Sequence, residues 1–175
     1  MSTTRLPSRV EPYKLAARSE RLEGLVALAD LERLTEEVGP QSGELRVTLD
    51  FAIDAQGRRV IHGRLQADLQ LPCRRCLTPM ARHVESEFLL GMVTSDDLAA
   101  ELPSTHEPVL VEDEQLNLLT VVEDELILSL PQVVYHEEAD CQVSRDQLTS
   151  GEDAAASRGP AASPFDVLKH LKGKS

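Results

Sequence analysis

The chain has 175 residues, of which 41% are hydrophobic and only 3% aromatic, and its net charge is −12; these values predict one domain with a core of Leu, Val and Ile. No apolar run approaches the roughly 20 residues that cross a bilayer, the first residues lack the apolar segment of a signal peptide, and three cysteines fit a disulfide-stapled secreted domain poorly. We therefore expect a cytoplasmic protein with no membrane partner.

The first predicted elements are a brief strand over residues 22–25 and a helix that follows it. Apolar side chains recur near helical spacing until Gly39-Pro40 ends the helix. These side chains are Leu28, Leu31, Leu34 and Val38.

Three strands follow the first helix. Residues 44–54 alternate between apolar and polar side chains, as a half-buried strand does. After a short turn the chain returns from Arg58 as the second strand of an antiparallel hairpin, and a third strand runs through residues 84–92. The stretch Cys73-Arg74-Arg75-Cys76, here called the knuckle, joins the second strand to the third.

The segment after the third strand combines a loop, a strand and a helix. Residues 95–108 are acidic and predict an exposed loop, and residues 108–111 predict a short edge strand. Asn117 is the expected N-cap of a helix that Pro131 ends. The apolar stripe of this helix should cover one side of the sheet, while Glu123, Asp124 and Glu125 are predicted to lie mostly on its solvated side. The elements together predict an α+β fold, a small antiparallel β-sheet covered by one or two helices.

Composition changes near the C-terminus. We expect residues 1–148 to form the single α+β domain and residues 149–163, which have almost nothing to bury, to be a flexible, disordered linker. Residues 164–175 predict a short amphipathic, basic terminal helix. We expect its apolar face to dock on its own domain or on a partner, through Phe165, Leu168 and Leu171.

Charge is unevenly distributed along the chain. Between His83 and Ser144 there is no Lys or Arg but fifteen Asp and Glu, whereas residues 57–82 contain six arginines and one acidic residue. The net charge opposes general binding to polyanions. Two local interactions fit this pattern, a basic face that grips one RNA feature and an acidic face that grips a basic protein. The acidic residues also serve solubility.

The arginines around the knuckle are the candidate RNA contacts, because guanidinium groups bind phosphate through paired hydrogen bonds and stack on bases. Phe51 and Phe88 are predicted to face the core, which favours contacts with RNA backbone or shape. The other interpretation is that the arginines are merely scattered on the outer face of a hairpin. The six candidates are Arg58, Arg59, Arg64, Arg74, Arg75 and Arg82.

The knuckle also generates a metal hypothesis. Cys73 and Cys76 are spaced so that both thiolates can point at one ion, and His136 and Cys141 would complete a Cys3His set, which is common in structural zinc sites. The alternative is that the knuckle cysteines only shape a turn and that the protein needs no cofactor. A redox role is disfavoured, since thioredoxin-like motifs open a helix in a βαβ context. The histidines are scattered and no phosphate loop or nucleophile elbow occurs, so we do not expect an enzyme.

Five pieces in this order resemble the YceD family, named for accumulation of large-subunit ribosomal RNA. They are Phe51-Ala52-Ile53-Asp54, the knuckle, residues 120–131, the pair His136 and Cys141, and the closing Pro164-Phe165-Asp166-Val167-Leu168. The resemblance runs over nearly the whole chain and is strongest to the proteobacterial branch. Other branches carry a second CxxC where this chain has His136 and Cys141, so one chain cannot form a four-cysteine zinc site.

The resemblance implies a non-enzymatic role in the synthesis, processing or stability of 23S rRNA, and so in assembly of the large ribosomal subunit. On this hypothesis the knuckle arginines meet rRNA or its precursor, while the acidic face or the terminal helix meets a basic assembly partner. The alternative is a protein–protein adaptor that holds a ribosomal protein or a ribonuclease, as an RNA-processing partner, without touching RNA.

Overall fold

The computed structural model describes residues 4–143. The chain divides into two compact units, Met1–Tyr135 and His136–Ser175, and the architecture below is that of the first unit. The predicted linker over residues 149–163 and the predicted terminal helix over residues 164–175, with Phe165, Leu168 and Leu171, lie outside the described residues.

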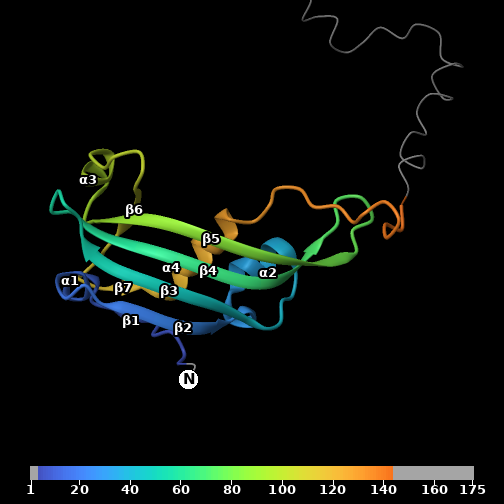
Figure 1. Cartoon of the computed structure of the whole chain (residues 1–175), viewed down its shortest axis with the longest axis horizontal. Helices are drawn as coiled ribbons and strands as arrows, with labels where there is room; N and C mark the ends of the chain where they lie inside the picture. Colours follow the sequence, from blue (N-terminus) through green and yellow to red (C-terminus); the bar gives the residue numbers. More distant parts are fainter. Residues whose placement is uncertain (1–3, 144–175) are drawn as a thin grey trace, which may run out of the picture. The chain divides into compact units, whose positions relative to one another are not determined.

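A five-stranded sheet forms the centre of the first unit, with its strands in the order β2-β3-β4-β5-β6 (Figure 1). The first four are antiparallel neighbours, and β6 is parallel to β5. The α+β prediction is confirmed, although the last strand departs from a purely antiparallel sheet. Its parallel direction requires a crossover, which residues 94–106 supply. The strands are β2 (Arg21–Ala27), β3 (Glu44–Ile53), β4 (Arg59–Pro72), β5 (Pro79–Val93) and β6 (Glu107–Leu110).

Alternation along β3 and β4 builds the core face of the sheet, as the sequence predicts. On β3 the inward side chains are at most 1% exposed, and they include Phe51. Gly63 interrupts the pattern on β4, because a Cβ there would lie 1.9 Å from the ring of Phe88 on β5. The Phe88 ring thus fills the space that a side chain at position 63 would need. The buried side chains of the two strands include Leu45, Val47, Leu49, Ile61, Leu65, Leu69 and Leu71.

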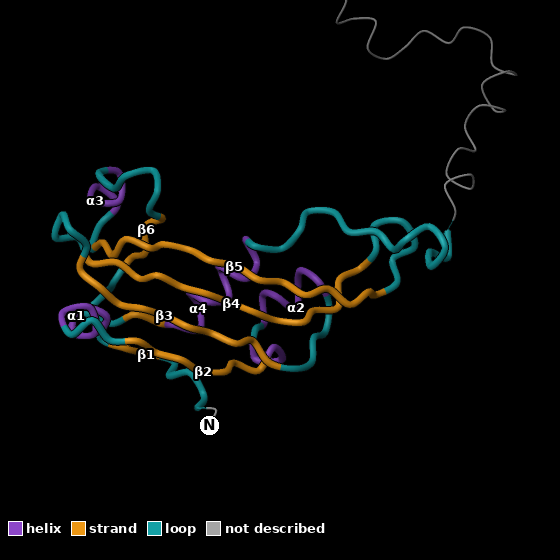
Figure 2. The backbone as a smooth tube through the Cα atoms, in the orientation of Figure 1, coloured by secondary structure: helices purple, strands orange, loops and turns teal. Residues whose placement is uncertain are grey.

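Two helices contribute leucines to the same core, α2 (Glu32–Val38) and α4 (Leu118–Leu128), and both are drawn in purple in Figure 2. The predicted N-cap of α4 is confirmed, since the Asn117 side chain accepts hydrogen bonds from the backbone N–H groups of Leu119 and Thr120, at 3.1 and 3.4 Å. The helix ends before Pro131, because residues preceding a proline disfavour helical geometry. Ser129 is the C-cap, and its hydroxyl donates to the carbonyl of Leu126 at 2.7 Å.

Several short helices and strands are not predicted from the sequence pattern. The predicted loop over residues 95–108 contains a helix and the start of β6, so that prediction is wrong in part. The reason is local, since the Ser95 side chain caps the helix by accepting from the backbone N–H of Leu98. No helix among residues 4–143 is long and apolar enough to cross a membrane. The short elements are β1 (Arg9–Val10), α1 (Pro12–Ala17), η1 (Leu28–Asp30), α3 (Asp96–Ala100) and β7 (Leu116–Asn117), and β1 pairs with β7.

Glu123 corrects the prediction that the acidic triplet of α4 lies on a solvated face, because it is only 8% exposed. Its carboxylate accepts hydrogen bonds from the backbone N–H groups of Arg33 and Leu34 at 2.8 and 3.1 Å. It also accepts a hydrogen bond from Nε of Arg33 at 3.1 Å. The residue at the N-cap of α2, Leu31, offers no side-chain cap. Glu123 therefore caps α2 from another helix, where a negative charge is favoured.

We expect Glu123→Ala to lower the free energy of unfolding by roughly 2–3 kcal/mol, because it leaves the backbone N–H groups of Arg33 and Leu34 without their acceptor and removes one of the two carboxylates that pair with Arg33. Urea unfolding measures this change. Asp124→Asn is the matched control, since Asp124 also pairs with Arg33 but is exposed; we expect it to cost under about 1 kcal/mol. Equal losses in the two variants would contradict the capping role of Glu123.

Candidate functional site

The knuckle is a tight turn that closes the β4–β5 hairpin. The backbone N–H of Cys73 donates to the carbonyl of Thr78 at 3.0 Å, and that of Leu77 donates to the carbonyl of Cys73 at 2.9 Å. Leu77 adopts a left-handed φ of 62°, which lets the chain reverse. Cys73 is buried and Cys76 is half-buried, so the turn holds one sulfur inside and one near the surface.

Both knuckle sulfurs have polar neighbours. The backbone N–H of Arg75 donates to Sγ of Cys73 at 3.4 Å, and Sγ of Cys76 lies 3.0 Å from the Thr78 hydroxyl. Hydrogen bonds of this kind orient and stabilise sulfur ligands around a metal. The local geometry of the turn therefore fits a thiolate pair.

The chain returns to the knuckle after α4. The backbone N–H of Arg74 donates to the carbonyl of Val134 at 2.9 Å, and the Arg82 guanidinium lies 3.5 Å from the carbonyl of Tyr135. The Arg75 guanidinium lies over the Tyr135 ring, 5.4 Å from its centre, within the range of a cation–π contact. His136 follows Tyr135 directly in the chain, so this docked segment leads into the second pair of predicted ligands.

One group of side chains in the described part of the chain could hold a metal ion, and it is the predicted set of Cys73, Cys76, His136 and Cys141. Three sulfurs and one imidazole form a donor set that suits zinc. The residues present therefore fit the metal that the sequence suggests.

The six predicted RNA-contacting arginines do not form one patch. Arg59 begins β4, and Arg58 directly precedes it, at the end opposite the knuckle, which at roughly 3.3 Å per residue is about 45 Å away. Arg58 pairs with Asp54 at 2.7 Å, and Arg59 lies over the Tyr13 ring at 5.0 Å. Arg64, partway along β4, pairs with a carboxylate on β5, that of Glu87.

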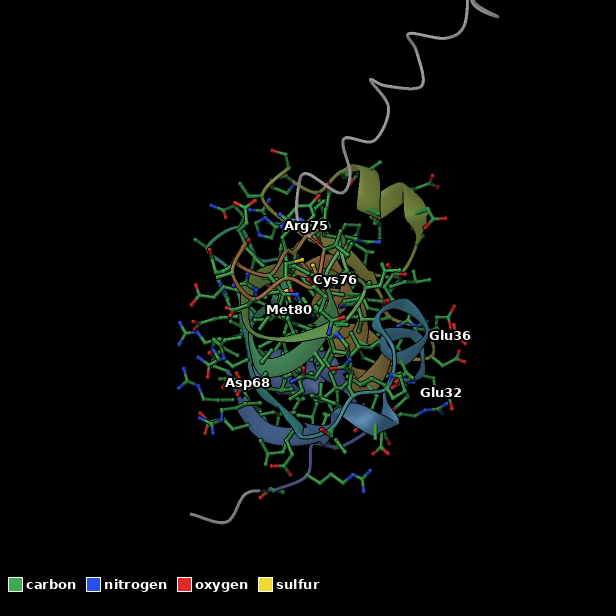
Figure 3. The ribbon with its side chains drawn as sticks, turned by 90° about the vertical axis from the view of Figure 1, so that its right-hand side faces the viewer. Glu32, Glu36, Asp68, Arg75, Cys76 and Met80 are labelled. Carbon is green, nitrogen blue, oxygen red and sulfur yellow. The ribbon has the colours of Figure 1, made fainter. Side chains whose placement is uncertain are left out.

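The other three arginines gather at the knuckle with unpaired charges. Arg74, Arg75 and Arg82 make no ion pair with any carboxylate in residues 4–143. Figure 3 looks at this end of the sheet and shows Arg75 beside Cys76. Nη1 of Arg75 is buried and has no hydrogen-bond partner in that range. The basic character of the knuckle is thus not neutralised by carboxylates within residues 4–143.

Tyr135 is the residue that the sequence interpretation missed. It is 48% exposed and stands against Arg75, so an aromatic ring accompanies the unpaired arginines. Stacking on a ring of this kind is a common way to hold an RNA base. The only signal in the sequence was an aromatic residue next to a predicted metal ligand, in a segment without periodicity.

The prediction of a solvated face on α4 is also wrong at Glu125, which is only 9% exposed. Unlike Glu123, its carboxylate accepts no hydrogen bond and makes no ion pair within the described residues. Burial, followed by the charges of Glu107 and Asp124, raises the pKa of Glu125 to about 7. The side chain lines a hollow that is shared by Glu107, Glu87 and His62.

Comparisons with a family model and with a curated relative agree on the family that this chain matches. Residues 61–172 match the family described as "Large ribosomal RNA subunit accumulation protein YceD". A protein of that name from Haemophilus influenzae is 38% identical over 178 residues, covering 99% of this chain and 100% of the relative. No solved structure matches the chain.

We expect Glu125→Gln to stabilise the protein above pH 7. Because the pKa of Glu125 in the folded state is raised from its ordinary value of 4.5 to about 7, the stability linked to its protonation is fully present below pH 4.5 and is lost as the pH rises through 7. Urea unfolding should therefore show little difference between variant and wild type near pH 4.5, and a gain of at most about 3 kcal/mol near pH 8. Glu32→Gln, an exposed control on α2, should show no such pH-dependent gain. A gap between Glu125→Gln and wild type that is equal at both pH values would contradict the assignment.

Proposed function

Since the chain belongs to the YceD family, we propose that it promotes the accumulation of large-subunit (23S) ribosomal RNA, in the cytoplasm, by binding rather than by catalysis. The relative from Haemophilus influenzae bears a name that states accumulation of the large ribosomal RNA subunit. The proposal extends that role to this chain and assigns the RNA contact to the knuckle.

The observation that supports RNA contact is the set of unpaired arginines at the knuckle. Elsewhere on the hairpin Arg58 and Arg64 pair with carboxylates, which leaves them less available to phosphate, and Arg59 lies at the end of β4 far from the knuckle. Arg74, Arg75 and Arg82 keep their charge for an outside anion, and arginine binds phosphate through two parallel hydrogen bonds. Tyr135 adds a surface on which a base can stack. Together they suit a short single-stranded segment or a loop of RNA.

We further propose that zinc is held by Cys73, Cys76, His136 and Cys141. Bound there, zinc would supply a structural crosslink rather than reactive chemistry. The knuckle already fixes its own turn through backbone hydrogen bonds, and the Arg74–Val134 contact holds the returning chain. The role of the four ligands would be to keep Tyr135 and the knuckle arginines in one arrangement, so that less ordering is required when RNA binds.

Zinc content tests the ligand set. Protein purified without a histidine tag should contain about one zinc per chain, and Cys73→Ser should lose it, as measured by elemental analysis. His83→Asn removes an exposed imidazole on β5 outside the set, and it should retain the metal. A wild-type protein that is fully folded without metal would contradict the zinc site and leave the RNA proposal standing.

Reversal of the knuckle charge tests RNA contact. We expect Arg74→Glu with Arg75→Glu to weaken binding to 23S rRNA fragments roughly tenfold or more, because two phosphate contacts become repulsive, and to lower mature 23S rRNA in cells that depend on the variant. Arg9→Glu with Arg46→Glu makes the same change in net charge at exposed positions and should leave both measurements near wild type. Circular dichroism should show all variants folded.

Recovery of the RNA and protein bound in cells separates RNA binding from the adaptor alternative. Protein recovered from its own cells, before and after nuclease treatment, should bring 23S precursor that depends on Arg74 and Arg75. A partner protein that survives nuclease, with no enrichment of 23S rRNA, would favour the adaptor and refute direct contact at the knuckle.

A further inference from the structure

The β5 strand has no strand partner on one of its two edges for most of its length. On one side it pairs with β4 from Pro79 to Gly91. On the other side β6 pairs only with its last four residues, Leu90–Val93. From Ser86 to Leu89, no strand of the described chain occupies that side. Free backbone N–H and C=O groups on such an edge can accept another strand.

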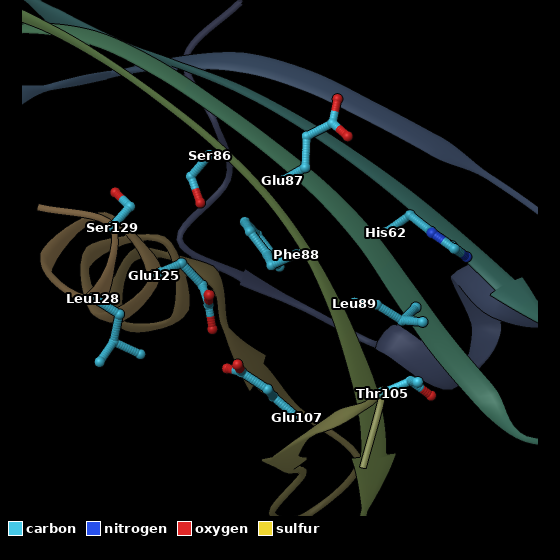
Figure 4. Close-up of a pocket in the computed structure, with 10 residues that line it drawn as sticks. All are labelled: His62, Ser86, Glu87, Phe88, Leu89, Thr105, Glu107, Glu125, Leu128 and Ser129. Atoms are coloured by element: carbon cyan, nitrogen blue, oxygen red, sulfur yellow. The ribbon is translucent and has the colours of Figure 1, made fainter. Parts of the chain in front are cut away.

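A hollow of about 520 Å³ lies beside this open stretch, and Figure 4 shows its lining. It has an apolar part and an acidic part. Phe88 and Leu128 give the apolar surface, and Leu128 is 72% exposed although it ends α4. Glu107 and Glu125 give the acidic part, and their carboxylates point toward each other in Figure 4.

The state of Glu125 indicates a missing partner. Its side chain is 9% exposed and receives no hydrogen bond or ion pair from residues 4–143, although it faces the hollow. A largely buried carboxylate of this kind is destabilised unless a cation or donor joins it, because only the hollow gives its oxygens access to water. Two residues earlier on the same helix, Glu123 is equally buried but satisfied by α2. The difference shows that α4 has one acidic group used within the fold and one that is not.

We propose that this hollow receives a lysine or arginine side chain from an extended, basic segment of a partner protein, whose backbone adds a strand to the free edge of β5. The cationic head would lie between Glu107 and Glu125, and its alkyl stem would lie along Phe88 and Leu128, since long cationic side chains bury their stems on apolar surface. The apolar part favours this ligand over a hydrated metal ion, which requires oxygen ligands all round. The carboxylates repel RNA phosphate. The site is separate from the knuckle and does not require the RNA proposal to hold.

Peptide binding tests the hollow directly. The probe is a dye-labelled octapeptide of alternating lysine and threonine, and its affinity for the full chain is measured by fluorescence anisotropy at fixed salt. Glu107→Gln with Glu125→Gln should weaken binding about tenfold or more, because these two carboxylates supply the charge contact. Glu32→Gln with Glu36→Gln removes the same two charges from α2, where Figure 3 shows both side chains pointing outward. This control should stay within about twofold of wild type. Equal losses in the two double variants would overturn the site, since affinity would then follow net charge alone.

Two further measurements keep the outcome distinct from folding and from RNA binding. The Glu107/Glu125 variant should be at least as stable as wild type to urea, so weak binding cannot reflect unfolding. Arg74→Glu with Arg75→Glu should not weaken peptide binding, whatever it does to RNA. A peptide with an N-methyl group on every backbone amide cannot donate backbone hydrogen bonds to the edge of β5, and it should bind about tenfold more weakly. Unchanged affinity for that peptide would overturn the strand addition.

Discussion

The pairing of β4 with β5 is the constraint on which both candidate sites depend. Thirteen consecutive residue pairs, from Val60 with Gly91 to Pro72 with Pro79, hold the two strands in one register. A slip by one residue would turn Leu65 and Val84 out of the core, so the register is fixed by burial. It places the knuckle at the tip of the hairpin and the open edge of β5 beside α4. One hairpin therefore carries a basic end and an acidic flank.

The charged side chains of this domain fall into two groups, those that pair with an opposite charge inside the fold and those that have no such partner within residues 4–143. Arg33 with Glu123 and Arg64 with Glu87 neutralise one another across elements, and Arg58 with Asp54 does so within the turn between β3 and β4. The knuckle arginines have no such carboxylate partner within residues 4–143, and Glu125 has no cation there. Proteins tolerate uncompensated groups of this kind mainly where function requires them. The net charge of −12 conceals these two local imbalances of opposite sign.

The sequence predicted the regular parts of the fold because period-two alternation directly reports one buried face. It identified the three long strands, the Asn117 cap and the four members of the group that could hold a metal. It failed at Glu123 and Glu125, since a helix was assumed to have one buried side. Successive helix positions are about 100° apart, so these two side chains diverge by roughly 200°. Both are nevertheless buried, because α4 has α2 on one side and the edge of the sheet on the other. Arginine pairing could not be predicted either, as it depends on which residues the strand register brings opposite each other.

The cap that Glu123 supplies to α2 has a consequence for how the chain folds during synthesis. Glu123 follows Leu34 by 89 residues. At translation rates of about 5–20 residues per second, Glu123, which caps α2, is therefore synthesised roughly 5–20 s after α2. Over that interval β2, β3 and β4 can form their local meander, but the core face that α4 covers remains open to solvent. Such a nascent chain exposes apolar surface and strand edges, the features that chaperones recognise and that promote aggregation. Completion of this fold is therefore a late, cooperative event that the emergence of α4 from the translating ribosome triggers.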